Sequence, residues 1–253
     1  MMPALATDWA TISSLATAGG TLVLAVATFA AVRSSQRSAR IAEVALQEQR
    51  RPVFAPSRFD DPPQKIMFVE GKWVRAGGGR GAAEHEDGNV YLALSLRNVG
   101  AGIGVCQAWA ATAGLQTMSS APTHRPLDEF HTQVRDLYIP AGDIGMWQGA
   151  VRDQNHGDFA RLVEAIEAGE PITIELLYSD QVGDQRTITR FGLSPYLDPD
   201  SGERHWLVNA SRHWYLDRRG PRSESDTMAA SQAIAQQLEA SAASEPRSPS
   251  AAA

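Results

Sequence analysis

One uncharged stretch near the N-terminus limits what this chain can fold into more than any other feature. No Asp, Glu, Lys or Arg occurs between Asp8 and Arg33, and residues 12–32 read ISSLATAGGTLVLAVATFAAV. A helix needs about 20 mostly apolar residues to cross the hydrocarbon core of a bilayer. The run therefore predicts a single transmembrane helix, Ile12–Val32, within an N-terminal segment of residues 1–33.

Two other kinds of apolar helix fit this run less well. A core helix of a globular domain shows a polar face, and residues Leu22 to Val32 have none. A secretory signal carries positive charge ahead of its apolar part, whereas Asp8 is the only charged side chain before the run. A membrane anchor is therefore the favoured interpretation.

The flanks of the run set its expected orientation. Arg33, Arg37 and Arg40 follow it, and no Lys or Arg precedes it. Basic residues collect on the cytoplasmic side of membrane helices. We therefore expect a single-pass protein of the inner (plasma) membrane, with the lipid bilayer as one partner and a cytoplasmic soluble domain.

Two further features concern the helix itself. Ser13, Thr17 and Gly20 form a stripe of small residues at helical spacing, which allows close packing of two such helices and suggests a homodimer. Residues 34–51 are predicted to continue as a juxtamembrane helical spacer. Pro52 ends this spacer because proline lacks the N–H that a helix requires.

Residues 52–218 have the pattern of a β-rich domain, in which short apolar runs are separated by glycine, proline and aspartate. Nine strands are predicted: Val53–Arg58, Lys65–Val69, Val90–Val99, Val105–Thr112, Val134–Ile139, Met146–Val151, Ile172–Ser179, Arg186–Leu193 and Trp206–Tyr215. In the clearest of them apolar and other residues alternate from Val90 to Arg97. Such a strand buries one face, so we expect Leu92, Leu94 and Leu96 toward the core and Ser95 and Arg97 outward or toward an edge.

One short helix interrupts these strands. Asp158 is its predicted N-cap, an apolar stripe runs from Phe159 to Ile166, and Gly169 and Pro171 end it. Many strands with a single covering helix favour an antiparallel immunoglobulin-like sandwich, a mainly β fold. The Cys–Trp–Cys arrangement of true immunoglobulin domains is absent, so only the architecture is predicted.

Composition excludes several classes of function. Residues 219–253 are rich in alanine, serine and glutamine and predict a disordered tail. The formal net charge of −6 argues against nucleic acid as a partner, because such proteins present basic surfaces. The single cysteine, Cys106, excludes an intrachain disulfide and a multi-cysteine zinc site, and its apolar surroundings predict a small core residue.

Three loops resemble ligand-binding motifs without matching them. Gly100–Gly104 has the spacing G-x-G-x-G instead of the dinucleotide-binding G-x-G-x-x-G, and a turn or bulge that needs positive φ is favoured. Gly77–Gly81 lacks the Lys-Ser/Thr end of a phosphate-binding loop and predicts a mobile loop. Asp198–Glu203 has too few acidic positions for an EF-hand and fits a turn.

The histidines do not form a recognisable metal motif. None is paired at the spacing H-x-x-x-H or H-E-x-x-H among His85, His124, His131, His156, His205 and His213. His205 and His213 are predicted on one face of the last strand, about 25 Å apart and too distant to share a metal. A core-facing row is predicted for Trp206, Val208, Ala210 and Trp214. No catalytic, cofactor-binding or metal residue is assigned, and no cofactor is expected.

Several segments together resemble an uncharacterised family of bacterial single-pass membrane-anchored proteins with a β-rich soluble domain. They are LATAGGTLVLAVATFAAVRSSQRSAR, RPV, LRNVGAGIG, DLYIPAGDIGMWQG, TITRFGL and RHWYLDR, between Leu15 and Arg218. The resemblance implies that anchor and β-domain belong together, and it implies no activity or catalytic residues.

Three functions are weighed on these grounds. A non-enzymatic, membrane-tethered interaction or scaffolding protein with an unknown protein partner is favoured. A small-ligand sensor with a pocket in the β-domain is the alternative. A membrane-bound hydrolase would need a nucleophile beside a base. A deep pocket with convergent polar groups favours the second and third functions, and an exposed apolar patch favours the first.

The predicted topology can be tested with a reporter that is active only in the periplasm. We expect such a reporter fused after Arg218 to be inactive, because the arginines that follow the anchor hold that side in the cytoplasm. Strong reporter activity, or intact protein in the soluble fraction, would contradict the prediction.

Overall fold

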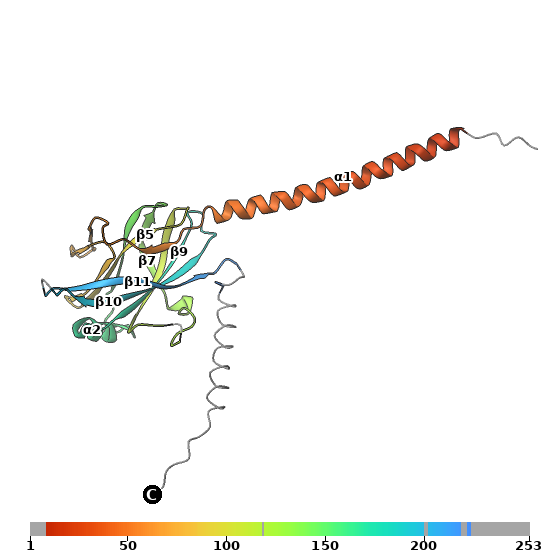
Figure 1. Cartoon of the computed structure of the whole chain (residues 1–253). Helices are drawn as coiled ribbons and strands as arrows, with labels where there is room; N and C mark the ends of the chain where they lie inside the picture. Colours follow the sequence, from red (N-terminus) through yellow and green to blue (C-terminus); the bar gives the residue numbers. More distant parts are fainter. Residues whose placement is uncertain (1–8, 118, 200–201, 219–221, 224–253) are drawn as a thin grey trace, which may run out of the picture. The chain divides into compact units, whose positions relative to one another are not determined.

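The computed structural model describes residues 9–117, 119–199, 202–218 and 222–223 (Figure 1). The chain divides into two compact units, Met1–Gln49 and Arg50–Ala253. The first unit holds the predicted anchor and nearly all of the spacer, and the second holds the β-domain. Of the predicted tail, Ser223 is buried and forms a bridge with Tyr215, whereas residues 219–221 and 224–253 lie outside the described part.

The first unit is built on one continuous helix, α1 (Trp9–Glu48), of 40 residues. The predicted transmembrane run and the spacer are therefore parts of the same helix, which ends shortly before Pro52. Within the described residues it is one helix that is long and apolar enough, by length and composition, to cross a membrane.

Threonine side chains in α1 hydrogen-bond within the helix. The hydroxyls of Thr17, Thr21 and Thr28 donate to the carbonyls of Ser13, Thr17 and Leu24 at 2.9, 2.8 and 2.7 Å. An unsatisfied donor is costly in hydrocarbon, and this back-bonding removes that cost. The polar residues of the run are therefore compatible with a lipid environment.

In its described residues the second unit contains eleven strands and a second α-helix. In chain order they are β1 (Phe54–Pro56), β2 (Gln64–Met67), β3 (Trp73–Ala76), β4 (Arg80–Glu86), β5 (Asn89–Asn98), β6 (Gly104–Ala113), β7 (His131–Ile139), β8 (Ile144–Val151), α2 (Phe159–Ala168), β9 (Ile172–Ser179), β10 (Thr187–Leu197) and β11 (Arg204–Tyr215). Each of the predicted strands overlaps an observed one. Strands β3 and β4 were not predicted, and β4 begins inside the glycine run Gly77–Gly81.

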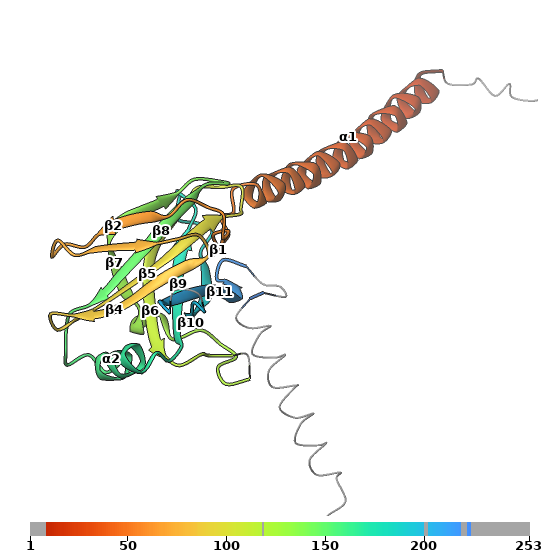
Figure 2. The same ribbon diagram turned by 60° about the vertical axis from the view of Figure 1, so that its left-hand side comes forward.

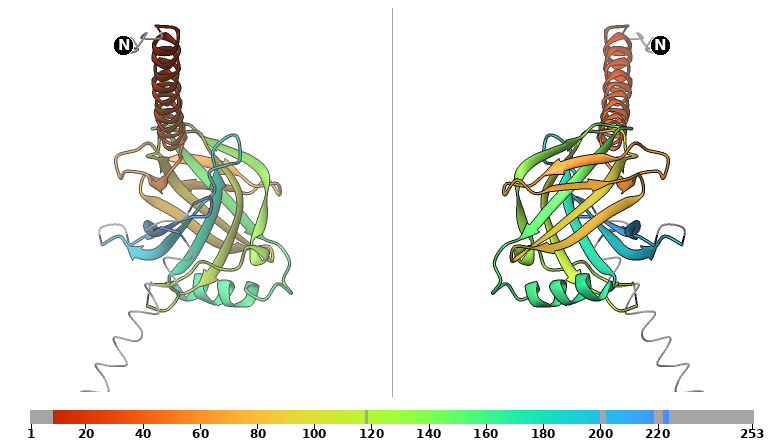
Figure 3. Two further views of the ribbon diagram at one scale, coloured as in Figure 1. Left: turned by 90° about the vertical axis from the view of Figure 1, so that its right-hand side faces the viewer. Right: turned by 90° about the vertical axis from the view of Figure 1, so that its left-hand side faces the viewer.

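Most of the strands form one antiparallel sheet that curls into a half-barrel (Figures 2 and 3). The order is β1-β5-β4-β11-β10-β9-β6-β7, β8 pairs with β5, and β2 and β3 form a separate two-stranded sheet. The predicted immunoglobulin-like sandwich is not confirmed, because a sandwich packs two sheets face to face and here a single sheet wraps around its own core. Register shifts at Cys106/Ala108 and Arg190/Phe191 mark the bulges that bend and twist the strands.

The half-barrel encloses the main apolar core, and α2 lies across one end of it (Figure 3). The α2 prediction is confirmed in extent, and Gly169 ends the helix in the left-handed region with a φ of 66°. Asp158 occupies the N-cap position, as predicted, but its side chain makes no capping hydrogen bond. Its carboxylate accepts a 2.7 Å hydrogen bond from Arg125.

Strand β5 is buried on both faces, unlike the one-sided strand that was predicted. Leu92, Leu94 and the other even-numbered residues from 90 to 96 face the barrel core, as predicted. On the opposite face Tyr91 packs edge-on against Phe68 of the β2–β3 hairpin, at a ring-centroid distance of 4.8 Å. Ser95 lies on this outer face, as predicted, but it is fully buried there and shares a 2.7 Å hydrogen bond with Ser57.

Burial on two faces predicts large losses of stability on both sides of β5. Leu94→Ala should cost about 2–5 kcal/mol of the free energy of unfolding, and Tyr91→Ala about 3–5 kcal/mol. Tyr138→Ala, which removes an exposed tyrosine of β7, is the control and should stay within about 0.5 kcal/mol. Urea unfolding of the full chain in mild detergent measures all three, and equal losses for the two tyrosine variants would contradict the packing of the hairpin on β5.

Candidate functional site

The half-barrel does not close between β7 and β8. Strand β7 pairs with β6 on one side and β8 pairs with β5 on one side, and within the described residues the two share no ladder. A short connection, residues 140–143, joins them. We call the opening between these edge strands the seam. An unpaired edge offers backbone N–H and C=O groups to another chain.

The middle of β7 is also detached from β6. Cys106 pairs with Leu137 and Ala108 pairs with Thr132, so residues 133–136 have no partner in the register between the two strands. Val134 lies in this segment and is 92 % exposed. The register shift therefore turns the centre of β7 into an irregular edge with an apolar side chain in solvent.

One side chain bridges the seam in place of a ladder. The Gln133 amide nitrogen donates to the Gln148 carbonyl at 3.3 Å, and the Gln133 amide oxygen accepts from the Trp147 indole N–H at 3.2 Å. A carboxamide carries the same donor and acceptor as a peptide group. The Gln133 side chain thus forms the hydrogen bonds that one peptide group of a neighbouring strand would form, and it connects β7 and β8 at that point.

Aromatic rings close the interior of the barrel behind the seam. Trp109 meets Trp147 edge-on with ring centroids 5.4 Å apart, and His131 stacks on Trp109 at 4.5 Å. Gly149 permits this packing, because a Cβ there would lie 2.7 Å from the Trp147 ring and 2.8 Å from the Trp109 ring. Burial, with a smaller contribution from His156, lowers the pKa of His131, so its imidazole is neutral at pH 7.

A hollow of about 470 Å³ lies over this aromatic wall in the seam. Its walls come from β6, β7, β8 with the residue that follows it, and the turn of the β2–β3 hairpin, and include Phe68, Trp109, Val134, Arg135, Gln148 and Arg152. Gln148 is only 8 % exposed, and its Oε1 atom has no hydrogen-bond partner among the described residues. A buried amide oxygen without a donor costs stability, so this atom indicates most clearly where a bound molecule could donate a hydrogen bond in the hollow.

A second polar arrangement resembles a nucleophile beside a base. The Tyr178 hydroxyl lies 2.8 Å from Thr189 Oγ1, which lies 2.7 Å from Nδ1 of His213. Burial lowers the pKa of His213 to about 4, so the ring is neutral. Thr189 and Tyr178 are fully buried, and a substrate cannot reach the hydroxyl. This chain therefore has a structural role: it joins β9, β10 and β11.

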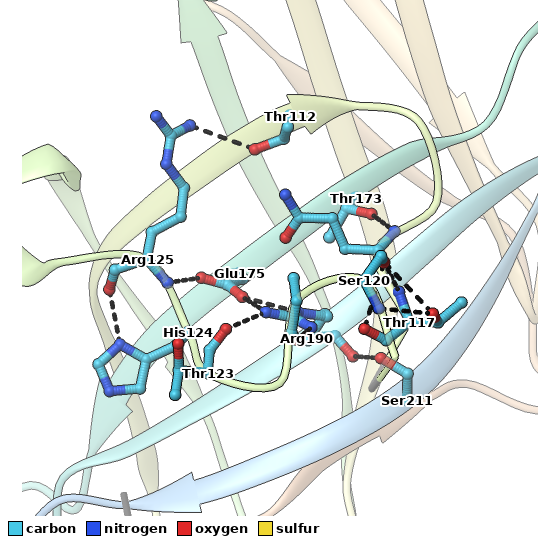
Figure 4. A network of polar contacts seen from close by, with 12 residues as sticks. Thr112, Thr117, Ser120, Thr123, His124, Arg125, Thr173, Glu175, Arg190 and Ser211 are labelled. Atoms are coloured by element: carbon cyan, nitrogen blue, oxygen red, sulfur yellow. Dashed lines mark hydrogen bonds and ion pairs between the residues drawn. The ribbon is translucent and has the colours of Figure 1, made fainter. Parts of the chain in front are cut away.

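A third arrangement is a buried ion pair between residues of β9 and β10 (Figure 4). Arg190 Nε donates to Glu175 at 2.7 Å, and the two side chains are 1 % and 2 % exposed. Arg190 also donates to the carbonyls of Ala121 and Thr123, and Glu175 accepts from the Arg125 backbone N–H at 2.8 Å. The pair thereby fixes the long β6–β7 connection to the sheet and has its hydrogen bonds satisfied within the protein.

The register shift in β11 separates residues that were predicted on one face. Trp206 and Val208 lie in the barrel core, whereas Trp214 packs in another cluster with Leu177 and Ile188. Ala210, predicted in the same buried row, is exposed. His205 approaches Asp198 at 4.0 Å and His213 bonds Thr189, so the predicted shared face of the two histidines is wrong. The cause is the bulge opposite Arg190 and Phe191, which shifts the alternation by one residue.

The glycine-rich segments are tightly packed turns. A Cβ at Gly102 would lie 1.7 Å from the Arg50 carbonyl oxygen, so close approach, and not positive φ, requires glycine there. A Cβ at Gly78 would lie 1.9 Å from the Arg58 carbonyl oxygen, and the Gly79 N–H donates to Ser57 at 3.0 Å. The predicted mobile loop is therefore wrong, because neighbouring backbone holds these glycines. In the third motif, residues 200–201 lie outside the described part.

The remaining candidate residues do not gather into a site. Cys106 is buried, and burial raises the pKa of its thiol to about 12, which keeps it neutral. Across the described ranges, no group of three or more His, Cys, Asp or Glu side chains is arranged to hold a metal ion. The residues of the seam were not identified from the sequence, where the one signal is a glutamine, Gln148, inside the apolar run Met146–Val151.

Comparisons with known proteins give no further guidance. No family model matches the chain, and no curated protein is similar to it at a significant level. The geometry of the seam is therefore the feature that indicates a function.

The buried ion pair predicts a large effect of one conservative substitution. Glu175→Gln should cost about 3–5 kcal/mol of the free energy of unfolding, because it leaves the Arg190 guanidinium buried without its counter-charge. Glu129→Gln removes an exposed partner of Arg125 and should cost under about 1 kcal/mol. Thermal or urea unfolding compares the two variants, and similar small losses in both would contradict the structural role of the pair.

Proposed function

We propose that this protein is a membrane-tethered interaction protein whose β-domain binds a partner at the seam. The observation that supports this function is an open half-barrel whose two edge strands, β7 and β8, share no ladder within the described residues, with an exposed apolar side chain, Val134, on β7. Soluble proteins usually cover or charge such edges, because they invite pairing with other chains. An edge that is left open is therefore a good binding surface.

The anchor belongs to the same proposal. α1 spans the inner membrane as a single pass, and the β-domain lies in the cytoplasm, because Arg33, Arg37 and Arg40 follow the apolar run. A homodimer through the small-residue stripe of α1 would bring two seams together on one membrane. A scaffolding protein of this kind binds its partner without catalysing a reaction, so its site needs no catalytic residues.

A small-ligand sensor is the second candidate, and one observation favours it. A hollow of about 470 Å³ is within the size range of small-molecule sites, and the unpartnered Gln148 oxygen offers a specific contact. The exposed apolar rim and the strand edges favour the interaction protein over the sensor, because a small molecule would leave both uncovered.

Site-specific photo-crosslinking in native membranes tests the proposed function. A photoreactive phenylalanine analogue at Val134 should give a discrete crosslinked protein product, because this residue stands in the seam. The same analogue at Val182, an exposed valine in the β9–β10 turn, is the matched control and should give none. Equal crosslinking at both positions, or no product at Val134, would contradict the proposal.

A further inference from the structure

We propose that the seam binds an extended segment of a partner protein that carries an acidic side chain, and that this segment takes the place of the Gln133 carboxamide between β7 and β8, with a backbone group bonded to Gln148. The inference rests on the proposed function and names the chemistry of the partner. Four properties of the seam support it.

The first property is the buried carboxamide. Gln148 is 8 % exposed, lines the hollow and has an amide oxygen without a donor in the described part of the chain. An extended peptide presents N–H and C=O groups in alternation along its edge. A peptide backbone can therefore bond to the Gln148 carboxamide whichever way the oxygen and nitrogen of that carboxamide are placed.

The second property is the direction of the β8 backbone. The Gln148 carbonyl accepts from Gln133 across the seam, so the main-chain groups of Gln148 face the seam and not β5. In an antiparallel strand every second residue points its N–H and C=O to the same side. Met146 and Ala150 therefore also present main-chain groups to the seam, a spacing that suits an added strand.

The third property is the sign of the charge. None of the described residues that line the hollow carries a carboxylate, whereas two of them are arginines. Arg152 forms an ion pair with Glu70. Arg135 makes no ion pair or hydrogen bond with any described residue, so it is the cation that is left for a partner. An acidic side chain near Arg135 complements this charge, and a basic one is repelled.

The fourth property is the apolar rim. Val69, in the turn of the β2–β3 hairpin, and Val134, in β7, are 82 % and 92 % exposed, and both line the hollow. Side chains of an added strand alternate between its two faces, so those on one face can cover the two valines. A small amide compound would leave both valines in water, whereas a peptide segment can cover them.

Binding of short peptides to the full chain in detergent micelles tests the inference. The probes are two capped, fluorescently labelled hexapeptides of alternating valine and threonine, one with a central glutamate and one with a central lysine. We expect the glutamate peptide to bind about fivefold more tightly than the lysine peptide. A copy of the glutamate peptide with alternate backbone nitrogens methylated should bind about tenfold more weakly, because it lacks the N–H donors along one of its edges.

Two variants place the peptide in the seam. Arg135→Glu should reverse the preference between the two charged peptides, while Arg161→Glu on the exposed side of α2 should leave it unchanged. Gln148→Met should weaken both peptides about tenfold, and Gln185→Met, a buried glutamine of the β9–β10 turn, should not. Arg135 is exposed, so its variant reports on binding even if Gln148→Met fails to fold.

The outcomes separate the inference from the proposed function. No binding of the glutamate peptide, or an unchanged preference in Arg135→Glu, overturns the inference. Full competition by the capped amino acid N-acetylglutamate amide also overturns it and indicates a small-ligand site. If peptides fail to bind while Val134 still crosslinks specifically in membranes, the interaction function stands and only the acidic strand is wrong. Failure of both experiments removes both proposals.

Discussion

The constraint that shapes the rest of the structure is the missing backbone ladder between β7 and β8. Strands β7 and β8 are consecutive and antiparallel, and their pairing would close the barrel, yet they stay unpaired in the described part of the chain. Backbone groups at such an edge need water or another partner. The protein supplies one substitute, the Gln133 carboxamide, and fills the space behind the edge with Trp109 and Trp147. The rest of the seam faces outward, and this makes it the functional candidate.

The other parts of the fold keep this opening in place. The β2–β3 hairpin covers the outer face of β5, the partner of β8, so one side of the seam rests on a strand that is buried on both faces. On the other side, Arg190 and Glu175 fix the connection that leads into β7. A buried pair of this kind contributes little net stability compared with apolar packing, and its value lies in the position that it enforces. Both edges are thus held from outside the hollow, and a partner can bind without rearranging the core.

The sequence predicted the local structure well and the arrangement of the sheet poorly, for physical reasons. Alternation and turn residues identified β9 and α2 with nearly their observed limits, because these signals are local. The choice between a sandwich and a half-barrel depends on bulges such as Cys106/Ala108, and one extra residue in a ladder leaves no mark on composition. The seam could not be predicted for the same reason: Gln133 and Gln148 meet only because β7 and β8 face each other across an unpaired gap. Strand β4 was missed because Gly81 and the glycines just before the strand are typical of a loop, although close packing requires glycine at Gly78 and Gly81.

An open edge and a membrane anchor fit together in physical terms. A free edge strand on a diffusing protein favours pairing with copies of itself, which leads to aggregation. Tethering each copy to a bilayer by α1 would restrict its orientation and its encounters with other copies. It would also raise the effective concentration of a partner that is held at the same membrane, so that a short strand with few contacts can bind usefully. A weak edge interaction that would be of little use in solution would thus become adequate at a surface, and on this reasoning the proposed anchor and the seam would serve one function.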